Sequence, residues 1–298
     1  MTARYRDTLI LLALAAIWGF SYIFIRVAVP AFGPIGLSLT RVAIGAAGLL
    51  IWMAVSGQLD QLPRINRPFL ILATLNALIP YTMIAFAELH VSASFAAILN
   101  ATTPPITAAI ATILARDRFT PALVSGMACG VLGVAVLVGW SPMPITGIVL
   151  IAIIAMIVAS ASYGVAGIFA KRSFAGTSSL SLAVGQQMSA SMLLLPFGIG
   201  SMAVSDAHEP MSRNPILAMI ALGLVCTSLA YLLYFHLIHA VGPVRTSMVT
   251  FLIPPFGILW GWIFLDEHVK PSMLLGLALI LISIRLVSRP QSPAPAQE

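Results

Sequence analysis

Residues 100–114 read NATTPPITAAIATIL and residues 250–264 read TFLIPPFGILWGWIF, so a Pro-Pro pair occupies the same place in each segment. The two pairs, Pro104-Pro105 and Pro254-Pro255, are 150 residues apart. At this offset other residues coincide: Tyr81 with Tyr231, Asp117 with Glu267, Pro121 with Pro271, Gly126 with Gly276 and Ala128 with Ala278. Farther upstream the offset is 145, which aligns Trp18-Gly19 with Tyr163-Gly164, Arg26 with Lys171 and Arg41 with Gln186. The pattern indicates an internal repeat over most of the chain.

The composition is strongly apolar. Of 298 residues, 60% are hydrophobic and 8% are charged, and the mean hydropathy is +1.03. A soluble domain carries roughly 25% charged residues. A chain with about a third of that proportion has too few charged side chains to cover a surface that faces water. The composition therefore excludes a soluble enzyme, a nucleic-acid-binding protein and a disordered chain. It predicts an all-α polytopic membrane protein.

The apolar runs have the length of membrane spans. A helix needs about 20 apolar residues to cross the hydrocarbon core, and cutting the chain at its charged and Pro/Gly-rich breaks predicts ten such helices. Their ranges are 8–28, 34–56, 68–88, 92–115, 121–139, 146–170, 178–203, 215–238, 243–265 and 272–288. The tail 289–298, RPQSPAPAQE, is predicted to be a disordered cytoplasmic segment.

Basic residues orient these spans, because lysines and arginines gather in cytoplasmic loops. Of the fifteen, eleven fall on one side of the predicted membrane, three fall on the other, and Arg41 falls within a span. This distribution places both termini in the cytoplasm and fits an even number of spans. It also explains the net charge of +6 without a nucleic-acid partner.

The repeat divides the spans into two units of five, residues 8–139 and 146–288. Because five is odd, the second unit enters the membrane upside down. Inverted repeats of this kind recur in secondary transporters, which bind their substrate near the bilayer midplane where the units meet. The sequence therefore predicts two inverted five-helix repeats that rock to open either face in turn.

Several motifs resemble a known family. They are Trp18-Gly19, Thr40-Arg41, the stretch 92–139 (SASFAAILNATTPPITAAIATILARDRFTPALVSGMACGVLGVAVLVG) and the stretch 244–290 (VRTSMVTFLIPPFGILWGWIFLDEHVKPSMLLGLALILISIRLVSRP). Together they resemble an EamA-type member of the drug/metabolite transporter superfamily. The resemblance implies a ten-helix, multi-pass carrier of the inner membrane, usually an exporter of amino acids, related metabolites or drugs. One departure is Arg116-Asp117, where members commonly have Gly-Glu.

Polar residues mark one face of two predicted helices. In the fourth span they are Asn100, Thr103, Pro104 and Thr107, and in the ninth span they are Ser247, Thr250, Pro254 and Gly257. Both sets follow helical spacing and centre on a Pro-Pro pair. Proline frees a carbonyl one turn earlier, which protein or water must satisfy. We expect a kinked helix lining a cavity in each half, with Pro104, Pro105, Pro254 and Pro255 as hinges; the alternative is a packing kink alone.

Aromatic and amide side chains add further candidates for substrate binding at similar depths. The aromatic ones are Trp18, Tyr22, Tyr81, Tyr163 and Tyr231, and the amides are Asn76 and Gln186, with Gln187 beside it. Single aromatics in spans are mostly packing residues or interface anchors, but such a group would suit an amphipathic or aromatic small molecule.

Two charged residues stand apart from the rest. Arg41 lies about seven residues into the second span, or roughly 10 Å below the predicted outer boundary, and could receive a substrate carboxylate. The alternatives are that Arg41 snorkels outward or pairs with Glu88. Glu88 borders the third span and is the candidate for proton coupling, while His236 fits a surface role. Either the protein couples through Glu88 at the outer gate, or it is a facilitator.

The predicted function is that of an alternating-access secondary transporter that exports small amphipathic metabolites such as amino acids or drugs. It is not an enzyme, it uses no cofactor or metal, and it works as a monomer or homodimer. One alternative is a membrane-embedded enzyme of lipid metabolism, but HExxH, DxxD and a pair of mid-span acids do not occur. The other is a non-transporting scaffold or sensor subunit, which would not need a cavity that water can enter.

Overall fold

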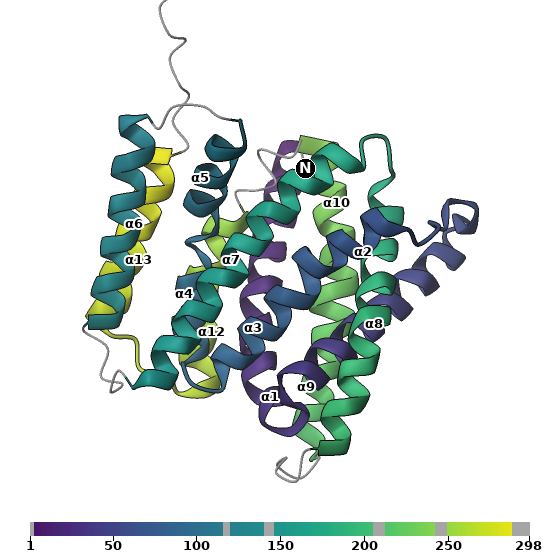
Figure 1. Ribbon diagram of the computed structural model, residues 1–298, viewed down its shortest axis with the longest axis horizontal. Coiled ribbons are helices and arrows are strands. Elements are labelled where there is room, and N and C mark those ends of the chain that lie inside the picture. Colours follow the sequence, from purple (N-terminus) through teal and green to yellow (C-terminus); the bar gives the residue numbers. More distant parts are fainter. Residues whose placement is uncertain (1–2, 116–119, 140–145, 205–211, 242–248, 288–298) are drawn as a thin grey trace, which may run out of the picture.

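The computed structural model describes residues 3–115, 120–139, 146–204, 212–241 and 249–287. Within these ranges the chain is all-helical, with helices joined by turns and short loops (Figure 1). Six stretches are long and apolar enough to cross a membrane: Arg6–Val55, Arg67–Glu88, Ala93–Leu114, Gly147–Ser173, Ser179–Ser201 and Arg213–Tyr234. Shorter apolar helices cover Pro121–Val136, Leu252–Leu265 and Pro271–Ser283. The expectation of a polytopic α-helical membrane protein is thereby confirmed.

The first two predicted spans form one bent element, α1 (Ala3–Val55). Pro30 and Pro34 lie inside it, and Gly33 between them has a φ of 65°. This left-handed conformation suits glycine, because a side chain would clash there. The bend separates an arm that carries Trp18 from an arm that carries Arg41.

The predicted fourth and ninth spans differ although both contain Pro-Pro. The fourth is divided into α4 (Ala93–Asn100) and α5 (Thr103–Ala115), and Thr102 at the break donates its hydroxyl to the Leu99 carbonyl at 2.7 Å. The ninth, α12 (Val249–Leu265), continues as one helix through Pro254 and Pro255. The break therefore depends on the residues before the proline pair as well as on the pair itself.

The predicted third and eighth spans each contain a π-helical segment. In the third, η2 (Thr74–Leu78) lies between α2 (Arg67–Ala73) and α3 (Ile79–Glu88). In the eighth, η3 (Leu224–Leu229) lies between α9 (Arg213–Gly223) and α10 (Ala230–Val241). The two segments begin 150 residues apart, at Thr74 and Leu224.

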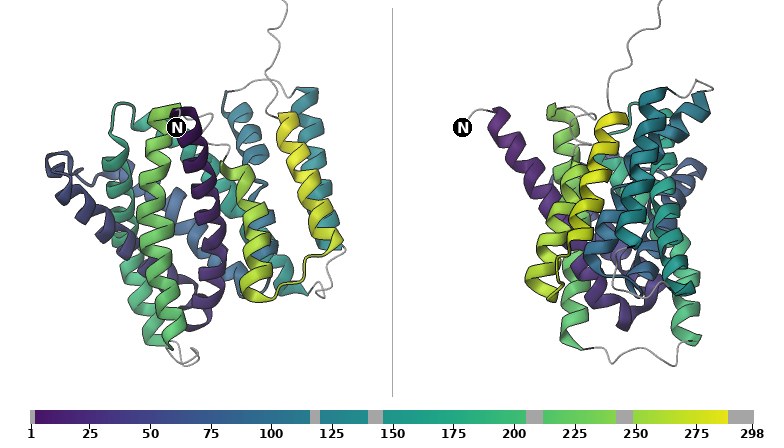
Figure 2. Two further views of the ribbon diagram at one scale, coloured as in Figure 1. Left: turned by 180° about the vertical axis from the view of Figure 1, so that it is seen from behind. Right: turned by 90° about the vertical axis from the view of Figure 1, so that its left-hand side faces the viewer.

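The remaining helices are α6 (Pro121–Gly139), α7 (Gly147–Ser173), α8 (Ser179–Val204) and α13 (Pro271–Val287). Helices α6 and α13 lie side by side at one end of the molecule (Figure 1), where a Cβ on Gly133 would stand 3.0 Å from the Gly276 carbonyl oxygen. Helix α1 packs against α8, α9, α10 and α12 (Figure 2), α3 packs against α7, and α4 packs against α12.

Two glycines allow close helix contacts at equivalent places. A Cβ on Gly19 of α1 would lie 2.7 Å from the Phe256 Cβ and 3.1 Å from the Gly257 amide nitrogen. A Cβ on Gly164 of α7 would lie 2.7 Å from the Thr107 Oγ1. Gly19 and Gly164 are partners in the repeat alignment, as are Thr107 and Gly257, so the same contact occurs twice, each time between a helix of one half and a helix of the other.

Candidate functional site

Two tyrosines from distant parts of the chain meet inside the helical bundle. The hydroxyl oxygens of Tyr81 on α3 and Tyr231 on α10 are 3.4 Å apart. These residues are aligned by the repeat, with 150 positions between them. The Tyr81 side chain is buried, in a cluster with Val42, Ala77 and Ala190, which fixes its ring beside α1 and α8.

Each tyrosine is contacted by the equivalent residue of its own half. The Arg41 guanidinium carbon lies 4.0 Å from the centroid of the Tyr81 ring, within the range of a cation–π interaction. In the second half the Gln186 amide donates to the Tyr231 hydroxyl at 3.2 Å. Because Arg41 aligns with Gln186, the two contacts are related by the repeat. The first half has a positive charge at this position and the second half has a neutral amide.

The π-helical segments supply a second partner to each of these residues. Asn76 in η2 donates its amide to the Gln186 Oε1 at 2.7 Å, and Thr227 in η3 accepts from the Arg41 Nε at 3.2 Å. Thr227 also donates to the Leu222 carbonyl, five residues earlier, so its hydroxyl satisfies a carbonyl in the π-helical turn. The predicted site residues that these contacts link are Arg41, Asn76, Tyr81, Gln186 and Tyr231, and Thr227 joins them through Arg41.

Arg41 carries the charge of this cluster, and its side chain is buried, with 7% of the residue exposed. Ion pairs within 4.0 Å among the described residues join Asp7 to Arg6 and to His236, and neither includes Arg41. The expected alternative of an Arg41–Glu88 pair is therefore wrong. The two residues stand on different helices, and the Arg41 side chain is held over Tyr81 and against Thr227 instead. A buried arginine without a carboxylate partner is suited to an anionic ligand.

Glu88 is the last residue of α3 and is completely buried. Neither of its carboxylate oxygens has a hydrogen-bond partner among the described residues. The guanidinium of Arg26 donates instead to the backbone carbonyl of Glu88 and, at 3.5 Å, to that of Val91. Across the turn, the Glu267 carboxylate accepts from the backbone amides of Ala93 at 2.8 Å and Ser94 at 3.0 Å. The turn between α3 and α4 is therefore held from two sides.

Tyr22 and Tyr163 border the cluster. Tyr22 is buried on α1 and lies within electrostatic range of both Arg41 and Glu88. Tyr163 on α7 lies within electrostatic range of Arg41, Tyr81 and Tyr22, and packs against two of the core clusters. Both residues were expected at a binding site.

Other predicted residues make contacts elsewhere. The ring of Trp18 lies 5.5 Å from that of Tyr234. The Thr103 hydroxyl bonds to the Asn100 carbonyl at 2.7 Å, and that of Thr107 bonds to the Thr103 carbonyl at 2.8 Å. Thr250 lies in the first turn of α12, and Ser247 lies outside the described residues. The contacts described for Trp18, Asn100 and Thr103 lie away from the tyrosine pair, and their role at the site stays a prediction.

Thr227 is the site residue that the sequence did not single out. It lies one position after Cys226, which aligns with Asn76, in the short polar run Cys226-Thr227-Ser228 of an apolar span. A comparison of the two halves that also considers the neighbours of each aligned polar residue would have found Thr227.

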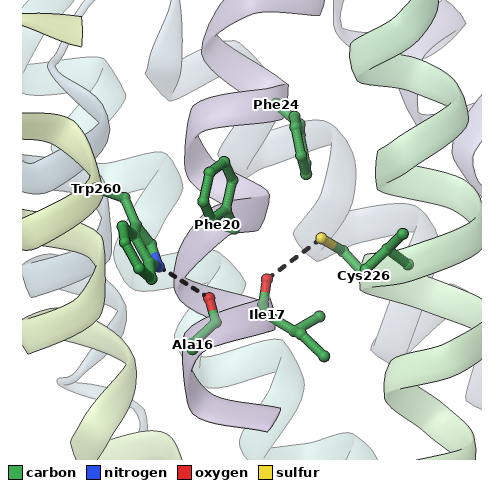
Figure 3. Close-up of a pocket in the computed structure, with 7 residues that line it drawn as sticks. Ala16, Ile17, Phe20, Phe24, Cys226 and Trp260 are labelled. Carbon is green, nitrogen blue, oxygen red and sulfur yellow. Dashed lines mark hydrogen bonds between the residues drawn. The ribbon is translucent and has the colours of Figure 1, made fainter. Parts of the chain in front are cut away.

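An apolar groove lies next to this cluster, between α1, η3 and α12 (Figure 3). Its volume is about 200 Å³, and it is lined by Ala16, Ile17, Phe20, Phe24, Val225, Cys226 and Trp260. The polar groups of two lining side chains are occupied: the Trp260 Nε1 donates to the Ala16 carbonyl at 3.0 Å and the Cys226 thiol donates to the Ile17 carbonyl at 3.2 Å. The groove therefore offers surface for an apolar group and none for a charge.

Comparison with known proteins agrees with this architecture. The model of the EamA-like transporter family matches residues 7–139 and again residues 150–289. Two similar proteins are the "Uncharacterized transporter YoaV" of Bacillus subtilis, 21% identical over 92% of this chain and 94% of its own, and the "Probable terminal-alkyne amino-acid exporter" of Streptantibioticus cattleyicolor, 24% identical over 91% and 90%. A crystal structure that is 18% identical superposes with a TM-score of 0.65, covering 95% of this chain and 96% of the other.

Proposed function

The chain belongs to the EamA-like transporter family, and from this premise we propose that it carries small amphipathic metabolites, such as amino acids or drugs, out of the cytoplasm by alternating access. The cluster of Arg41, Asn76, Tyr81, Gln186 and Tyr231 is the proposed substrate site. The observation that carries this proposal is the buried Arg41, which lies over Tyr81 and has no carboxylate within 4.0 Å in the part of the chain that the structure describes. An amphipathic anion would supply the missing charge, and the aromatic rings would contact its apolar part.

Three observations support two inverted five-helix units, residues 8–139 and 146–288. The π-helical segments begin 150 residues apart, Gly19 and Gly164 make equivalent close contacts, and the family model matches the chain twice. Tyr81 and Tyr231 come from equivalent positions and their hydroxyls meet, which is the contact expected of residues next to an axis that relates the units. A site on that axis is open in turn to either face as the units rock.

The proposed orientation is that of a carrier in the inner membrane with both termini in the cytoplasm. The bias of lysines and arginines along the sequence supports it. A reporter fused to the C-terminus tests it, since green fluorescent protein folds in the cytoplasm and alkaline phosphatase becomes active outside it. An active phosphatase fusion would contradict the orientation.

Two driving forces fit the proposed cycle: a proton carried by Glu88, or the solute gradient alone. Glu88 is buried, and Arg26, Glu267, Arg41 and Tyr22 are the charged or titratable groups around it. Efflux from vesicles with and without a pH gradient separates the two mechanisms.

Transport by purified protein in liposomes is the test of the proposed function. Vesicles loaded with unlabelled L-phenylalanine should take up radiolabelled L-phenylalanine by counterflow, and Arg41→Ala should abolish the uptake while it leaves expression intact. Arg213→Ala, which removes an exposed arginine at the start of α9, is the matched control and should transport normally. Equal uptake by Arg41→Ala and the control would refute the assignment of the site. Absence of flux for every amino acid and drug tried would refute the function.

Reactivity of introduced cysteines separates a transporter from the two alternatives, a membrane-embedded enzyme of lipid metabolism and a scaffold or sensor. Asn100→Cys and Thr250→Cys should react with a water-soluble thiol reagent, because a transport pathway holds water. A dry, unreactive interior would favour the scaffold.

A further inference from the structure

Two buried ionisable side chains, a guanidinium and a carboxyl group, lie in the same part of the bundle without bonding to each other. Arg41 has hydrogen-bond and ring partners and no carboxylate within 4.0 Å, and Glu88 has no hydrogen-bond partner for either carboxylate oxygen among the described residues. Burying a charge without a partner of opposite charge is unfavourable. A ligand that brings a group of opposite charge to each of the two side chains would therefore allow both to be charged at once.

The other charged groups around Glu88 are already engaged. Arg26 donates to the backbone carbonyls of Glu88 and Val91, and the Glu267 carboxylate accepts two amides at the start of α4. Arg41 is the third charged group in electrostatic range of Glu88. Tyr22, on α1, is in electrostatic range of both Arg41 and Glu88.

The positions of Tyr81 and Glu88 along α3 set the scale of the site. Arg41 lies over the ring of Tyr81, and Glu88 is seven residues farther along α3. Seven residues are two turns, so the side chains of Tyr81 and Glu88 leave the same face of α3, about 10 Å apart along its axis. Between them on that face are Ile84 and the small Ala85, both buried.

An α-amino acid has the dimensions to fit between these charges. Its ammonium and carboxylate are roughly 3 Å apart from standard bond lengths, and a charge-assisted hydrogen bond at each end adds about 2.8 Å. The total of roughly 9 Å is close to the two-turn spacing along α3. The apolar side chain of the ligand would then lie against the tyrosine rings.

We propose that Arg41 and Glu88 form a two-ended site that selects zwitterions, in which Arg41 binds the carboxylate of the transported solute and Glu88 binds its ammonium group. This inference rests on the proposed function, and it assigns Glu88 to substrate recognition. A zwitterionic α-amino acid is thereby distinguished from a simple carboxylic acid or a simple amine, because each of these leaves one buried charge unpaired.

The test compares three ligands that share a phenyl ring and a short chain: L-phenylalanine, 3-phenylpropionate and 2-phenylethylamine. Binding to the purified full-length protein in nanodiscs is measured by calorimetry. We expect L-phenylalanine to bind at least about tenfold more tightly than either analogue. Equal binding of L-phenylalanine and 3-phenylpropionate by the unmodified protein would overturn the proposal without the need for any variant.

Two variants assign the ends of the ligand. Glu88→Gln should bind L-phenylalanine and 3-phenylpropionate equally and still discriminate against 2-phenylethylamine. Arg41→Gln should bind L-phenylalanine and 2-phenylethylamine equally and still discriminate against 3-phenylpropionate. Asp60→Asn and Arg213→Gln, which remove exposed charges of each sign, are the matched controls and should keep the original order. Loss of affinity for all three ligands by the same factor in Glu88→Gln would show a structural role and overturn the assignment of Glu88.

Transport assays in liposomes distinguish a failure of this proposal from a failure of the proposed function on which it rests. If the three ligands bind in the expected order but none is transported in liposomes, the site stands and the transport function fails. If L-phenylalanine is transported and Glu88→Gln transports it with unchanged selectivity over 3-phenylpropionate, the function stands and the zwitterion site fails.

Discussion

The hydroxyl oxygens of Tyr81 and Tyr231 meet at 3.4 Å. Arg41 lies over the Tyr81 ring, and Gln186, which the repeat aligns with Arg41, donates to the Tyr231 hydroxyl. The pair joins α3 of the first half to α10 of the second. A change at either tyrosine therefore acts on the connection between the two halves.

The tyrosine pair should behave as one interaction. Tyr81→Phe and Tyr231→Phe each remove the contact between the hydroxyls, so each should lower the free energy of unfolding by about 1 kcal/mol. The double variant should lose less than the sum of the two, with a coupling of at least about 0.5 kcal/mol. Chemical denaturation in detergent, followed by circular dichroism, measures all four proteins. Strictly additive losses would show that the two hydroxyls do not interact.

Replacing Arg41 by lysine should keep the charge and lose most of the transport. An ammonium has no planar fork, so it cannot hold Thr227 and a carboxylate at once while it lies over the Tyr81 ring. We expect a fall in the initial rate of L-phenylalanine counterflow of about tenfold or more. Transport by Arg41→Lys at the unmodified rate would show that charge alone is needed.

Gly164 should not tolerate even a methyl group. A Cβ there would lie 2.7 Å from the Thr107 Oγ1 and 3.1 Å from the Thr107 Cα, so Gly164→Ala should destabilise the protein by about 1–3 kcal/mol. Gly167→Ala on the same helix is the control. Nothing lies within 4 Å of its added Cβ, and the higher helix propensity of alanine should make that change neutral or stabilising by up to about 1 kcal/mol. The midpoint of thermal unfolding should therefore fall in Gly164→Ala and stay the same or rise in Gly167→Ala.

The Glu267 carboxylate should stabilise the start of α4. Glu267→Gln replaces a negatively charged acceptor of two backbone amides by a neutral one. The free energy of unfolding should therefore fall by about 1 kcal/mol. The effect should be local, so hydrogen exchange should increase most at the amides of Ala93 and Ser94. Asp266→Asn, at the neighbouring exposed position with a φ of 52°, should leave exchange there unchanged, because asparagine tolerates this conformation well. Equal exchange in both variants would contradict the capping role.

Much of the candidate site was accessible from the sequence through the repeat. The offset of 150 pairs Tyr81 with Tyr231, whose hydroxyls meet in the structure. The offset of 145 pairs Arg41 with Gln186, and these residues contact Tyr81 and Tyr231 respectively. A residue close to the axis of a two-fold repeat meets its own counterpart, so aligned polar residues are natural candidates for such contacts.

The remaining features depend on local geometry that composition does not encode. Two identical Pro-Pro pairs interrupt one helix and leave the other continuous, because tertiary packing decides whether the freed carbonyls find partners. The π-helical segments change the direction of every side chain near them, so the contact between Thr227 and Arg41 could not be read from α-helical spacing. The expected Arg41–Glu88 pair failed because nearness in predicted depth says nothing about which way a side chain turns.

The two π-helical segments also set the angular register of the helices that follow them. Successive residues of an α-helix are turned by about 100° around its axis. A π-helical turn holds one residue more than an α-helical turn, so Thr74–Leu78 takes up an extra residue without turning Tyr81 away from its place on α3. Deleting one residue inside the segment would let it close into a regular α-helix with Tyr81 still facing the same way, and the same holds for Leu224–Leu229 and Tyr231 on α10. These two short segments are therefore places where a span can lose one residue and keep the contact between the halves.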